Sequence, residues 1–299
     1  MTEREGVALQ AAVRADAGGG VREEASFFGG PERLFGVTYL PPDPEVGVVI
    51  CSPIHAELLR NYRREVLLAR SLARSGYAVQ RFQYRGSGNS DGDPAEETFE
   101  SLCEDARAAV DRLVGTTGVE RLVFVGTRLG AVAAAVTGRT AGAVALAMWE
   151  PVLNGERYFR EIFRGHLVSG LKKAEDGEER KPSQELRDRG SVDVLGYSID
   201  RPLFESVRTR RLIDDAAQGA PPHVLLVQIG GGRGLRAEAG SLVERWREAG
   251  ASVRTHQLEG SEPWWFGGTP QISGEDPDRA GELTEVTSQW MLQSAPPRS

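Results

Sequence analysis

The chain has 299 residues, of which 40% are hydrophobic and 26% are charged. This composition can bury a sizeable core beneath a solvated surface, which excludes a disordered chain, and the length favours one large α/β domain with an insertion over two unrelated domains. The formal net charge of -7 argues against broad attraction to nucleic-acid phosphates, so nucleic acid is not an expected partner.

The N-terminal part of the chain predicts an arm followed by a hairpin. Residues 1–25 show no sustained periodicity and no apolar core of signal-peptide length, so we expect a flexible arm, with the fold starting near Ser26. Apolar patches broken by Gly and Pro over residues 26–42 predict an antiparallel hairpin at the edge of a sheet.

Residues 47–151 alternate between short apolar segments and longer helical ones. The apolar segments are bounded by Gly or Pro and have no polar face, which is typical of strands in a parallel sheet covered by helices on both faces. We expect strands at 47–53, 77–86, 121–126 and 143–151, and helices at 60–76, 99–115 and 130–140.

The alternation breaks after residue 151. Helical periodicity over 156–173 and 201–217, around a charged stretch at 174–189, predicts a helical cap over residues 151–220. Insertions at the carboxyl ends of parallel strands are where such folds build their ligand pockets, so we expect the cap to roof a binding site.

The alternation then resumes, with strands at 223–230 and 251–260, a helix at 241–250 and a last helix ending near Met291. The predicted fold is therefore a doubly wound, mostly parallel α/β sheet. Its core is built from residues 26–150 and 221–299.

Cysteine usage and hydropathy predict a cytoplasmic protein. Cys51 and Cys103 are too few for a disulfide framework, and they show no spacing typical of a zinc site. The longest apolar runs, 46–51 and 141–149, are too short to cross a bilayer. We expect free thiols and a protein that works without a membrane, a metal or another cofactor.

The strongest local signal is the segment 121–136, in which an apolar strand runs through GTRLG directly into an Ala-rich helix. Small residues at both ends of this pentapeptide, Gly126 and Gly130, allow a sharp strand-turn-helix elbow. Such an elbow holds its middle side chain, here Arg128, in a strained and exposed position above the sheet.

At this point the chain resembles the α/β-hydrolase superfamily, in which the middle residue of such an elbow is a Ser, Cys or Asp nucleophile. The segment YRGSGNSDG at residues 84–92 strengthens the likeness, because serine-aminopeptidase-like members carry a similar Arg-Gly-x-Gly-x-Ser segment. The resemblance extends from about Gly36 to Met291. It is narrowest to the exosortase-associated hydrolases, which commonly carry Arg at the elbow, in segments 51–93, 125–131, 149–159 and 262–273.

The sequence departs from that superfamily's catalytic pattern at all three triad positions. A guanidinium stays protonated at physiological pH, so Arg128 cannot be an acyl-accepting nucleophile, and a standard Ser-His-Asp mechanism is excluded. The triad acid usually follows the strand after the cap, yet no carboxylate occurs there before Glu238. The loop after the last strand, where the family's His usually lies, offers Ser261 and Glu262, while His256 falls inside the predicted strand.

Two roles for Arg128 stay open. At a helix N-terminus, free amides and the helix dipole reinforce a cation in holding a carboxylate or phosphate, which predicts an anion site. Alternatively, Arg128 forms an internal ion pair with Glu57 or Glu150 and holds the elbow together.

The loop after the first core strand supplies two titratable groups, His55 and Glu57, where hydrolases place the amides that stabilise an oxyanion. His55 can act as a general acid or base because imidazole titrates near neutral pH, or it can cap the following helix. The resembled group tends to keep a Glu at the place of Glu57, whose structural alternative is pairing with Arg128. Ser52, which precedes this loop, is an alternative nucleophile, but no base for it is evident in the sequence.

Further residues are expected to complete the pocket. Glu150 ends the strand before the cap and would face the same mouth, as a ligand group or as a loop anchor. Trp264 and Trp265 are candidates for an aromatic pocket wall, or for packing under a lid. The residues flanking the polar candidates complete the substrate-binding set: Ile54, Thr127 and Leu129.

We therefore expect a non-standard α/β-hydrolase-fold enzyme in which Arg128 orients an acidic or carbonyl-containing substrate while His55 or a carboxylate moves protons. The resemblance implies a small acyl, ester, thioester or carboxylate-bearing metabolite of exopolysaccharide or secondary metabolism. The alternative is a catalytically inactive relative that binds a metabolite or a partner protein.

Geometry should separate these two interpretations. An enzyme should bring Arg128, Glu57 and His55 to an open pocket, whereas a scaffold should bury Arg128 against carboxylates with no cavity beside it. The oligomeric state stays open, a homodimer included.

Overall fold

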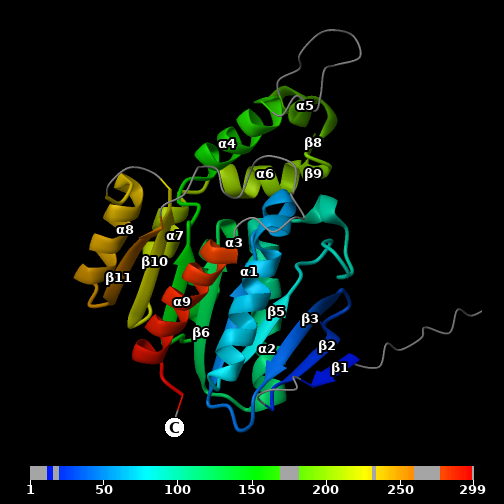
Figure 1. Ribbon diagram of the computed structural model, residues 1–299. Coiled ribbons are helices and arrows are strands. Elements are labelled where there is room, and N and C mark those ends of the chain that lie inside the picture. The colour runs from blue at the N-terminus through cyan, green and yellow to red at the C-terminus, as the bar shows by residue number, and fades with distance from the viewer. Residues whose placement is uncertain (1–11, 16–19, 169–181, 231–233, 259–276, 298–299) are drawn as a thin grey trace, which may run out of the picture.

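The computed structural model of the protein describes residues 12–15, 20–168, 182–230, 234–258 and 277–297. Within these residues nine strands form one sheet, in the order β1-β2-β3-β5-β4-β6-β7-β10-β11 (Figure 1). The strands are β1 (Ala12–Ala15), β2 (Arg22–Gly29), β3 (Arg33–Leu40), β4 (Val46–Cys51), β5 (Ala78–Phe82), β6 (Arg121–Thr127), β7 (Ala145–Trp149), β10 (His223–Ile229) and β11 (Ser252–Leu258).

The larger part of the sheet, from β5 to β11, is parallel, as the apolar segments predict. All residues of β4, β5 and β7 are buried. A strand without a polar face needs helices on both sides of the sheet, and the chain places a helix between successive strands to provide them. The carboxyl ends of these strands therefore share one edge.

The antiparallel part lies at the other side of the sheet and begins earlier than the sequence indicates. The hairpin expected over 26–42 is present as β2 and β3, which pair from Arg22 opposite Leu40 to Gly29 opposite Arg33. However, β1 and the first part of β2 fall within residues 1–25, the segment assigned to a flexible arm. Charged residues such as those at 22–24 are common in strands near a sheet edge, where they discourage edge-to-edge pairing. Here they hide the alternation of apolar and polar residues by which a strand is found in sequence.

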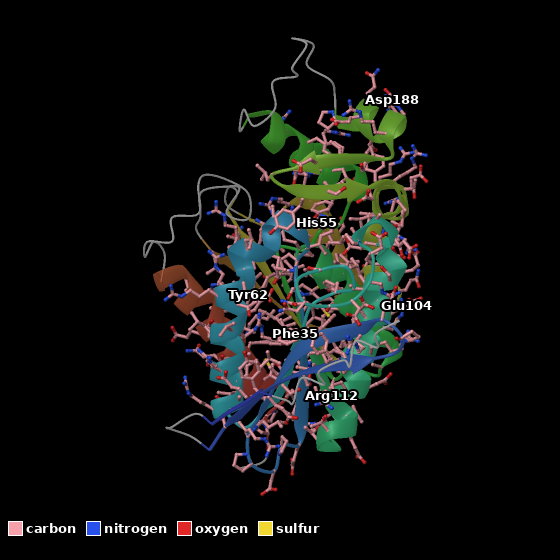
Figure 2. All side chains as sticks on the ribbon, turned by 90° about the vertical axis from the view of Figure 1, so that its right-hand side faces the viewer. Phe35, His55, Tyr62, Glu104, Arg112 and Asp188 are labelled. Atoms are coloured by element: carbon pink, nitrogen blue, oxygen red, sulfur yellow. The ribbon has the colours of Figure 1, made fainter. Side chains whose placement is uncertain are left out.

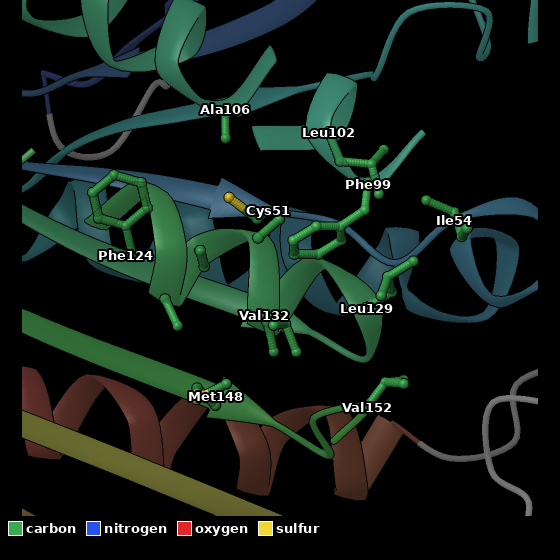
Figure 3. Close-up of a cluster of buried hydrophobic side chains, with 14 of the residues drawn as sticks. Cys51, Ile54, Phe99, Leu102, Ala106, Phe124, Leu129, Val132, Met148 and Val152 are labelled. Atoms are coloured by element: carbon green, nitrogen blue, oxygen red, sulfur yellow. The ribbon is translucent and has the colours of Figure 1, made fainter. Parts of the chain in front are cut away.

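Helices cover both faces of the sheet: α1 (His55–Arg74), α2 (Phe99–Thr117), α3 (Leu129–Thr140), α8 (Ala237–Glu248) and α9 (Pro277–Ser294), with a short 3-10 turn, η1 (Pro94–Glu96). Alternate residues of one strand supply the two cores. Phe124 packs in the core beneath α2 and α3 (Figure 3), while Val123 and Val125 pack in the core beneath α1 and α9. No helix in the described part of the chain is both long and apolar enough to cross a membrane.

The described residues of 151–220 contain α4 (Gly155–Val168), α5 (Pro182–Arg189), β8 (Ser191–Val194), β9 (Tyr197–Asp200), α6 (Arg201–Arg208) and α7 (Leu212–Ala217). The described residues from α4 to α6 lie beyond the carboxyl ends of the parallel strands (Figure 1), and α7 returns along the sheet beside α3 and α8. We call the described part of 151–220 the cap. Helices α4, α6 and α7 form where the periodicity predicts them, whereas α5 lies in the stretch expected to be a charged segment and the β8–β9 hairpin was not foreseen.

The hairpin has a clear origin in the sequence VDVLGYSI. Val192, Val194 and Ile199 are buried, while Asp193 and Ser198 are exposed, so the residues alternate as a half-buried ribbon requires. Leu195 and Gly196 at the turn both have positive φ, 56° and 85°, which matches the right-handed twist of a two-residue hairpin. The hairpin thereby turns an apolar face toward the rest of the cap and the core.

Candidate functional site

The turn between β6 and α3 holds Arg128 in a backbone conformation that L-residues rarely adopt, with φ 54° and ψ -121°. Its N–H donates to Trp149 O at 3.0 Å, and its carbonyl accepts from the Val152 N–H at 3.2 Å. Gly130 lets α3 begin here, because a Cβ at that position would lie 2.2 Å from Ser52 O. The elbow is therefore a strained turn that neighbouring backbone holds in place.

The side chain of Arg128 forms a buried cluster with Glu57 and Tyr158. Arg128 Nε donates to Glu57 Oε1 at 2.9 Å, and Tyr158 Oη donates to Glu57 Oε2 at 3.1 Å. The guanidinium carbon lies 5.5 Å from the centre of the Tyr158 ring, and Nη2 lies 3.6 Å from Glu161 Oε2. Arg128 is 4% exposed and Glu57 is 2% exposed. Of the two acids considered as partners for Arg128, Glu57 makes the ion pair.

Burial and charge act in opposite directions on this pair. Burial raises the pKa of the Glu57 carboxyl, although Arg128 and the Tyr158 hydroxyl oppose the shift. Burial would lower the pKa of Arg128, but Glu57 and Tyr158 outweigh it and the pKa of Arg128 is raised. The guanidinium stays charged and its charge is matched by Glu57, so removing either partner would leave an uncompensated buried charge.

His55 begins α1 with a φ of 52° and lies at the junction between this helix and the cap (Figure 2). Its Nε2 lies 3.0 Å from Glu97 Oε2, and its ring stacks on Tyr197 of β9, with ring centres 6.1 Å apart and 25° between the planes. Glu97 Oε2 has no hydrogen-bond partner among the described residues, so the two side chains are within ion-pair distance without an aligned hydrogen bond.

A pocket lies between the start of α1 and the cap. Its free volume is about 270 Å³ when the space open to solvent at the mouth is included. The enclosed part alone has room for roughly one water molecule. His55 and Glu57 share this pocket, as the sequence predicts, whereas Arg128 lies behind Glu57. The walls are Ile54, His55, Ala56, Glu57, Tyr158, Ile162, Val194, Tyr197 and Ile199.

Backbone strain is concentrated around this site. His55 after β4, Arg128 after β6 and Glu150 after β7 all have positive φ, and these three strands are neighbours in the sheet. Such conformations persist where the surrounding structure over-determines them, and they are most frequent at binding and catalytic sites. The carboxyl edge of the sheet beneath the cap therefore combines strain, titratable groups and a pocket.

Glu150 is part of a different contact. Its Oε2 accepts from the Ile229 N–H at 2.7 Å, and its Oε1 accepts from the Arg236 guanidinium. Burial raises the pKa of Glu150, and the Ile229 N–H and Arg236 oppose this shift. Glu150 is thus a loop anchor that ties β7 to the end of β10 and the start of α8, and it is not among the walls of the pocket.

The remaining residues expected in the pocket divide into three groups. Ile54 is buried and forms part of its wall. Thr127 and Leu129 are buried on either side of the elbow arginine, and neither belongs to the wall. Trp264 and Trp265 lie outside the described residues, as do Ser261 and Glu262.

Ser52 has a partner that sequence reasoning missed. Its Oγ donates to Glu65 Oε2 at 2.6 Å, and Glu65 lies 3.7 Å from Arg81 Nη2. Burial raises the pKa of Glu65 to about 7. The signal was the spacing of Glu57, Asn61 and Glu65, which puts three polar side chains on the buried face of α1. Ser52 is 3% exposed and outside the pocket wall, so this pair lacks access to a ligand.

Three residues of the site carried no recognisable signal in sequence: Glu97, Tyr158 and Tyr197. Glu97 is followed by the capping box that starts α2, Tyr158 lies within the amphipathic α4, and Tyr197 starts a strand in a segment predicted to be helical. They come from three separate segments. Tyr158 and Tyr197 meet Glu57 and His55 because the cap packs over the start of α1, whereas Glu97 reaches His55 from the loop between η1 and α2.

Comparisons with known proteins agree with this architecture. Residues 44–181 match the family model described as serine aminopeptidase, S33. The structure of Est1E from Butyrivibrio proteoclasticus with ferulic acid bound is similar over 90% of this chain and 99% of that chain, with a TM-score of 0.62 and 18% identity. An esterase from Pyrococcus furiosus is similar over 91% of each chain, with a TM-score of 0.60 and 13% identity.

A proline iminopeptidase from Mycobacterium smegmatis is similar over 90% of this chain and 98% of that chain, with a TM-score of 0.57 and 13% identity. The comparison with curated protein sequences gives no significant match. The fold is an α/β-hydrolase fold, and the family model and the structural neighbours together support the α/β-hydrolase superfamily. Function has to be argued from the site itself.

Proposed function

We propose that the protein is a non-standard α/β-hydrolase-fold enzyme that lacks the Ser-His-Asp triad. It acts without a cofactor on a small acyl, ester, thioester or carboxylate-bearing metabolite. The match to a serine aminopeptidase family and the likeness to an esterase support a hydrolase-type enzyme. The observation that carries the proposal is the convergence of His55, Glu57 and Tyr158 on one pocket beneath the cap.

In this proposal His55 is the general base. His55, with Glu97 at ion-pair distance behind it, takes a proton from a water molecule in the pocket, and the oxygen of that water attacks the carbonyl carbon of the substrate. The bond from this carbon to the leaving oxygen or sulfur then breaks, and His55 returns the proton to the leaving group. The products are a carboxylic acid and an alcohol or thiol, without a covalent enzyme intermediate.

The start of α1 supports the negative charge that develops on the carbonyl oxygen. The N–H groups of the first turn of any helix point out of its N-terminal end, and here that end borders the pocket. Within the described residues no side chain caps this N-terminus, so these N–H groups can donate to the carbonyl oxygen. Arg128 acts through Glu57: it holds one carboxylate oxygen while Tyr158 holds the other. We therefore assign Arg128 as a positioning residue in place of the substrate-binding role that the sequence suggests.

The test is turnover of p-nitrophenyl esters, acyl thioesters and a metabolite extract, followed by mass spectrometry. We expect the wild-type protein to hydrolyse a member of these sets and His55→Gln to lose about 10²- to 10⁴-fold in kcat. His223→Gln is the matched control, because His223 starts β10 at the opposite end of the strands from the pocket. In addition, a serine-directed fluorophosphonate should not label the active protein.

The absence of any turnover, or equal rates for His55→Gln and His223→Gln, would contradict the enzyme proposal. A fluorophosphonate label that abolishes activity would contradict direct attack by water, and Ser52→Ala would then show whether Ser52 carries the label.

A second candidate function is a catalytically inactive relative that binds a metabolite or a partner protein. The burial of Arg128 against Glu57 and Tyr158 favours it. A buried arginine whose charge is matched by a carboxylate can have a purely structural role. Retention of a small molecule from the extract, with no chemical change and equal retention by His55→Gln, is the outcome that this candidate predicts.

A further inference from the structure

The pocket beneath the cap is surrounded by carboxylates. Glu57 forms part of its wall, and Glu97 lies 3.0 Å behind His55. Arg128, the guanidinium behind the wall, is paired with Glu57 at 2.9 Å. No lysine or arginine is among the described residues that line the pocket. An anion that enters loses its hydration without a cation in the wall to replace it, which disfavours its binding.

The remaining walls are apolar and close together: Ile54, Ala56, Ile162, Val194 and Ile199, with the rings of Tyr158 and Tyr197. The enclosed part has room for about one water molecule, and the rest of the space is the open mouth. A ligand can therefore insert only a small apolar group between these walls. The apolar side chains gain from covering such a group, whereas a charged group would have to leave water without a partner.

The first turn of α1 adds hydrogen-bond donors to these walls. A helix N-terminus favours negative charge, and Glu57 in the first turn already supplies it. The backbone N–H groups of this turn can still donate to a neutral carbonyl oxygen. The site therefore matches an uncharged carbonyl group better than a carboxylate.

We infer that the pocket selects uncharged carbonyl compounds with a short apolar acyl or aryl group and discriminates against carboxylate-bearing ones. This inference rests on the proposed function for the location of the site, and it narrows the substrate class to neutral esters and thioesters. It replaces the expectation of an acidic ligand held by Arg128, because Arg128 is buried behind Glu57, accepts its counter-charge from that carboxylate and is not part of the pocket wall.

Tyr197 is the specificity-determining residue in this arrangement. It begins β9, directly after the Leu195–Gly196 turn, and its ring stacks on His55. The hairpin thus sets one flat wall of the pocket beside the proposed base. Ser198, the next residue of the same strand, is exposed and offers a matched control position.

The test is a binding titration followed by NMR with two matched pairs of probes, benzamide against benzoate and butyramide against butyrate. We expect each amide to bind the wild-type protein about tenfold or more tightly than its carboxylate, a difference of about 1.4 kcal/mol. Tyr197→Ala should weaken benzamide binding about tenfold, while Ser198→Ala leaves it unchanged. Equal or tighter binding of the carboxylates, or no saturable binding of either amide, would overturn the inference.

A charge-removing variant gives the reverse prediction. Glu57→Gln leaves Arg128 with an unmatched charge behind the wall, so benzoate should gain affinity relative to benzamide. If this variant fails to fold, Glu97→Gln takes its place, because it removes the other carboxylate near the pocket. Benzoate should again gain affinity relative to benzamide. An unchanged preference in the folded variant would overturn the electrostatic argument.

These titrations do not depend on turnover. A protein that prefers amides yet hydrolyses nothing would refute the proposed enzyme and leave the inference about the pocket intact. A protein that hydrolyses esters but binds benzoate as tightly as benzamide would do the opposite.

Discussion

Arg128 and Glu57 are 71 positions apart in the chain, yet the Nε of one lies 2.9 Å from the Oε1 of the other in a region closed to solvent. The pair joins the elbow after β6 to the first turn of α1. Because both charges are buried, the loss of one costs more than the loss of both. The pair is therefore a sensitive probe of how the site is held together.

We expect Glu57→Gln and Arg128→Met each to lower the free energy of unfolding by about 3–5 kcal/mol, since each leaves one buried group without its partner. The double variant Glu57→Met/Arg128→Met should recover a large part of this loss, because it removes both charges. Urea unfolding followed by circular dichroism measures the three values. Additive losses in the double variant would show that the two side chains are not coupled.

Glu97 should act on catalysis through His55. Its carboxylate stabilises the imidazolium that forms when His55 takes a proton, so Glu97→Gln should lower kcat about 10²-fold while KM for a neutral ester stays unchanged. The pH at which kcat rises should also move in this variant, whereas a purely structural role would leave the pH profile in place. Steady-state rates between pH 5 and pH 9 provide the measurement, and rescue by Glu97→Asp is the control.

Glu65 should make stability depend on pH. Burial raises its pKa from 4.5 to about 7, so the folded state keeps a proton that the unfolded chain releases between these values. This contribution to the free energy of unfolding is complete below pH 4.5 and is lost as the pH rises to about 7. The loss amounts to about 3 kcal/mol.

The comparison of wild type with Glu65→Gln isolates that contribution. Gln keeps the hydrogen bond from Ser52 but does not titrate, and all other groups are shared. The difference in unfolding free energy, wild type minus variant, should fall by about 3 kcal/mol between pH 4.5 and pH 7.5. Parallel pH curves for the two proteins would show that Glu65 titrates alike in the folded and unfolded states.

Gly130 should not tolerate a side chain. A Cβ there would lie 2.2 Å from Ser52 O and 2.5 Å from Cys51 O, and both atoms belong to the backbone. Gly130→Ala should therefore push α3 away from the end of β4 and cost about 3 kcal/mol or more. Thermal unfolding measures the effect.

Gly240 is the matched control for this substitution. It lies inside α8, and an added Cβ would meet nothing within 4 Å. Gly240→Ala should raise stability by up to about 1 kcal/mol, because alanine favours the helix. A similar change in melting temperature for both variants would contradict the close approach at the elbow.

Much of the core could be predicted from sequence because its signals are local. The apolar run of β4, the strand of β6 and the helix α3 that follows the GTRLG elbow each show their structure within a few residues. The start of the sheet was harder to find, because β1 and β2 carry the charged residues typical of strands near an edge. The β8–β9 hairpin was missed because a short, half-buried ribbon between helices shows only a few alternating residues.

The part of the site that could be predicted also depends on local signals. His55 and Glu57 are two positions apart, so a short segment after a predicted strand is enough to place them together. Glu150 was placed at the same mouth because its strand ends there, but its side chain contacts Arg236 and the Ile229 N–H. The direction of a side chain beyond a strand end depends on the partners that three-dimensional packing supplies.

By itself, the sequence determined the alternating strands and helices of the parallel part of the sheet, the elbow at Arg128 and the exclusion of a serine nucleophile there, because periodicity, turn residues and side-chain chemistry are properties of neighbouring positions. The tertiary structure decided which acid meets Arg128, and it brought Tyr158 and Tyr197 to the pocket and Glu97 to His55. Those contacts join segments separated by tens of residues. They depend on how the cap and the loop before α2 pack over the first turn of α1, and no local pattern encodes that packing.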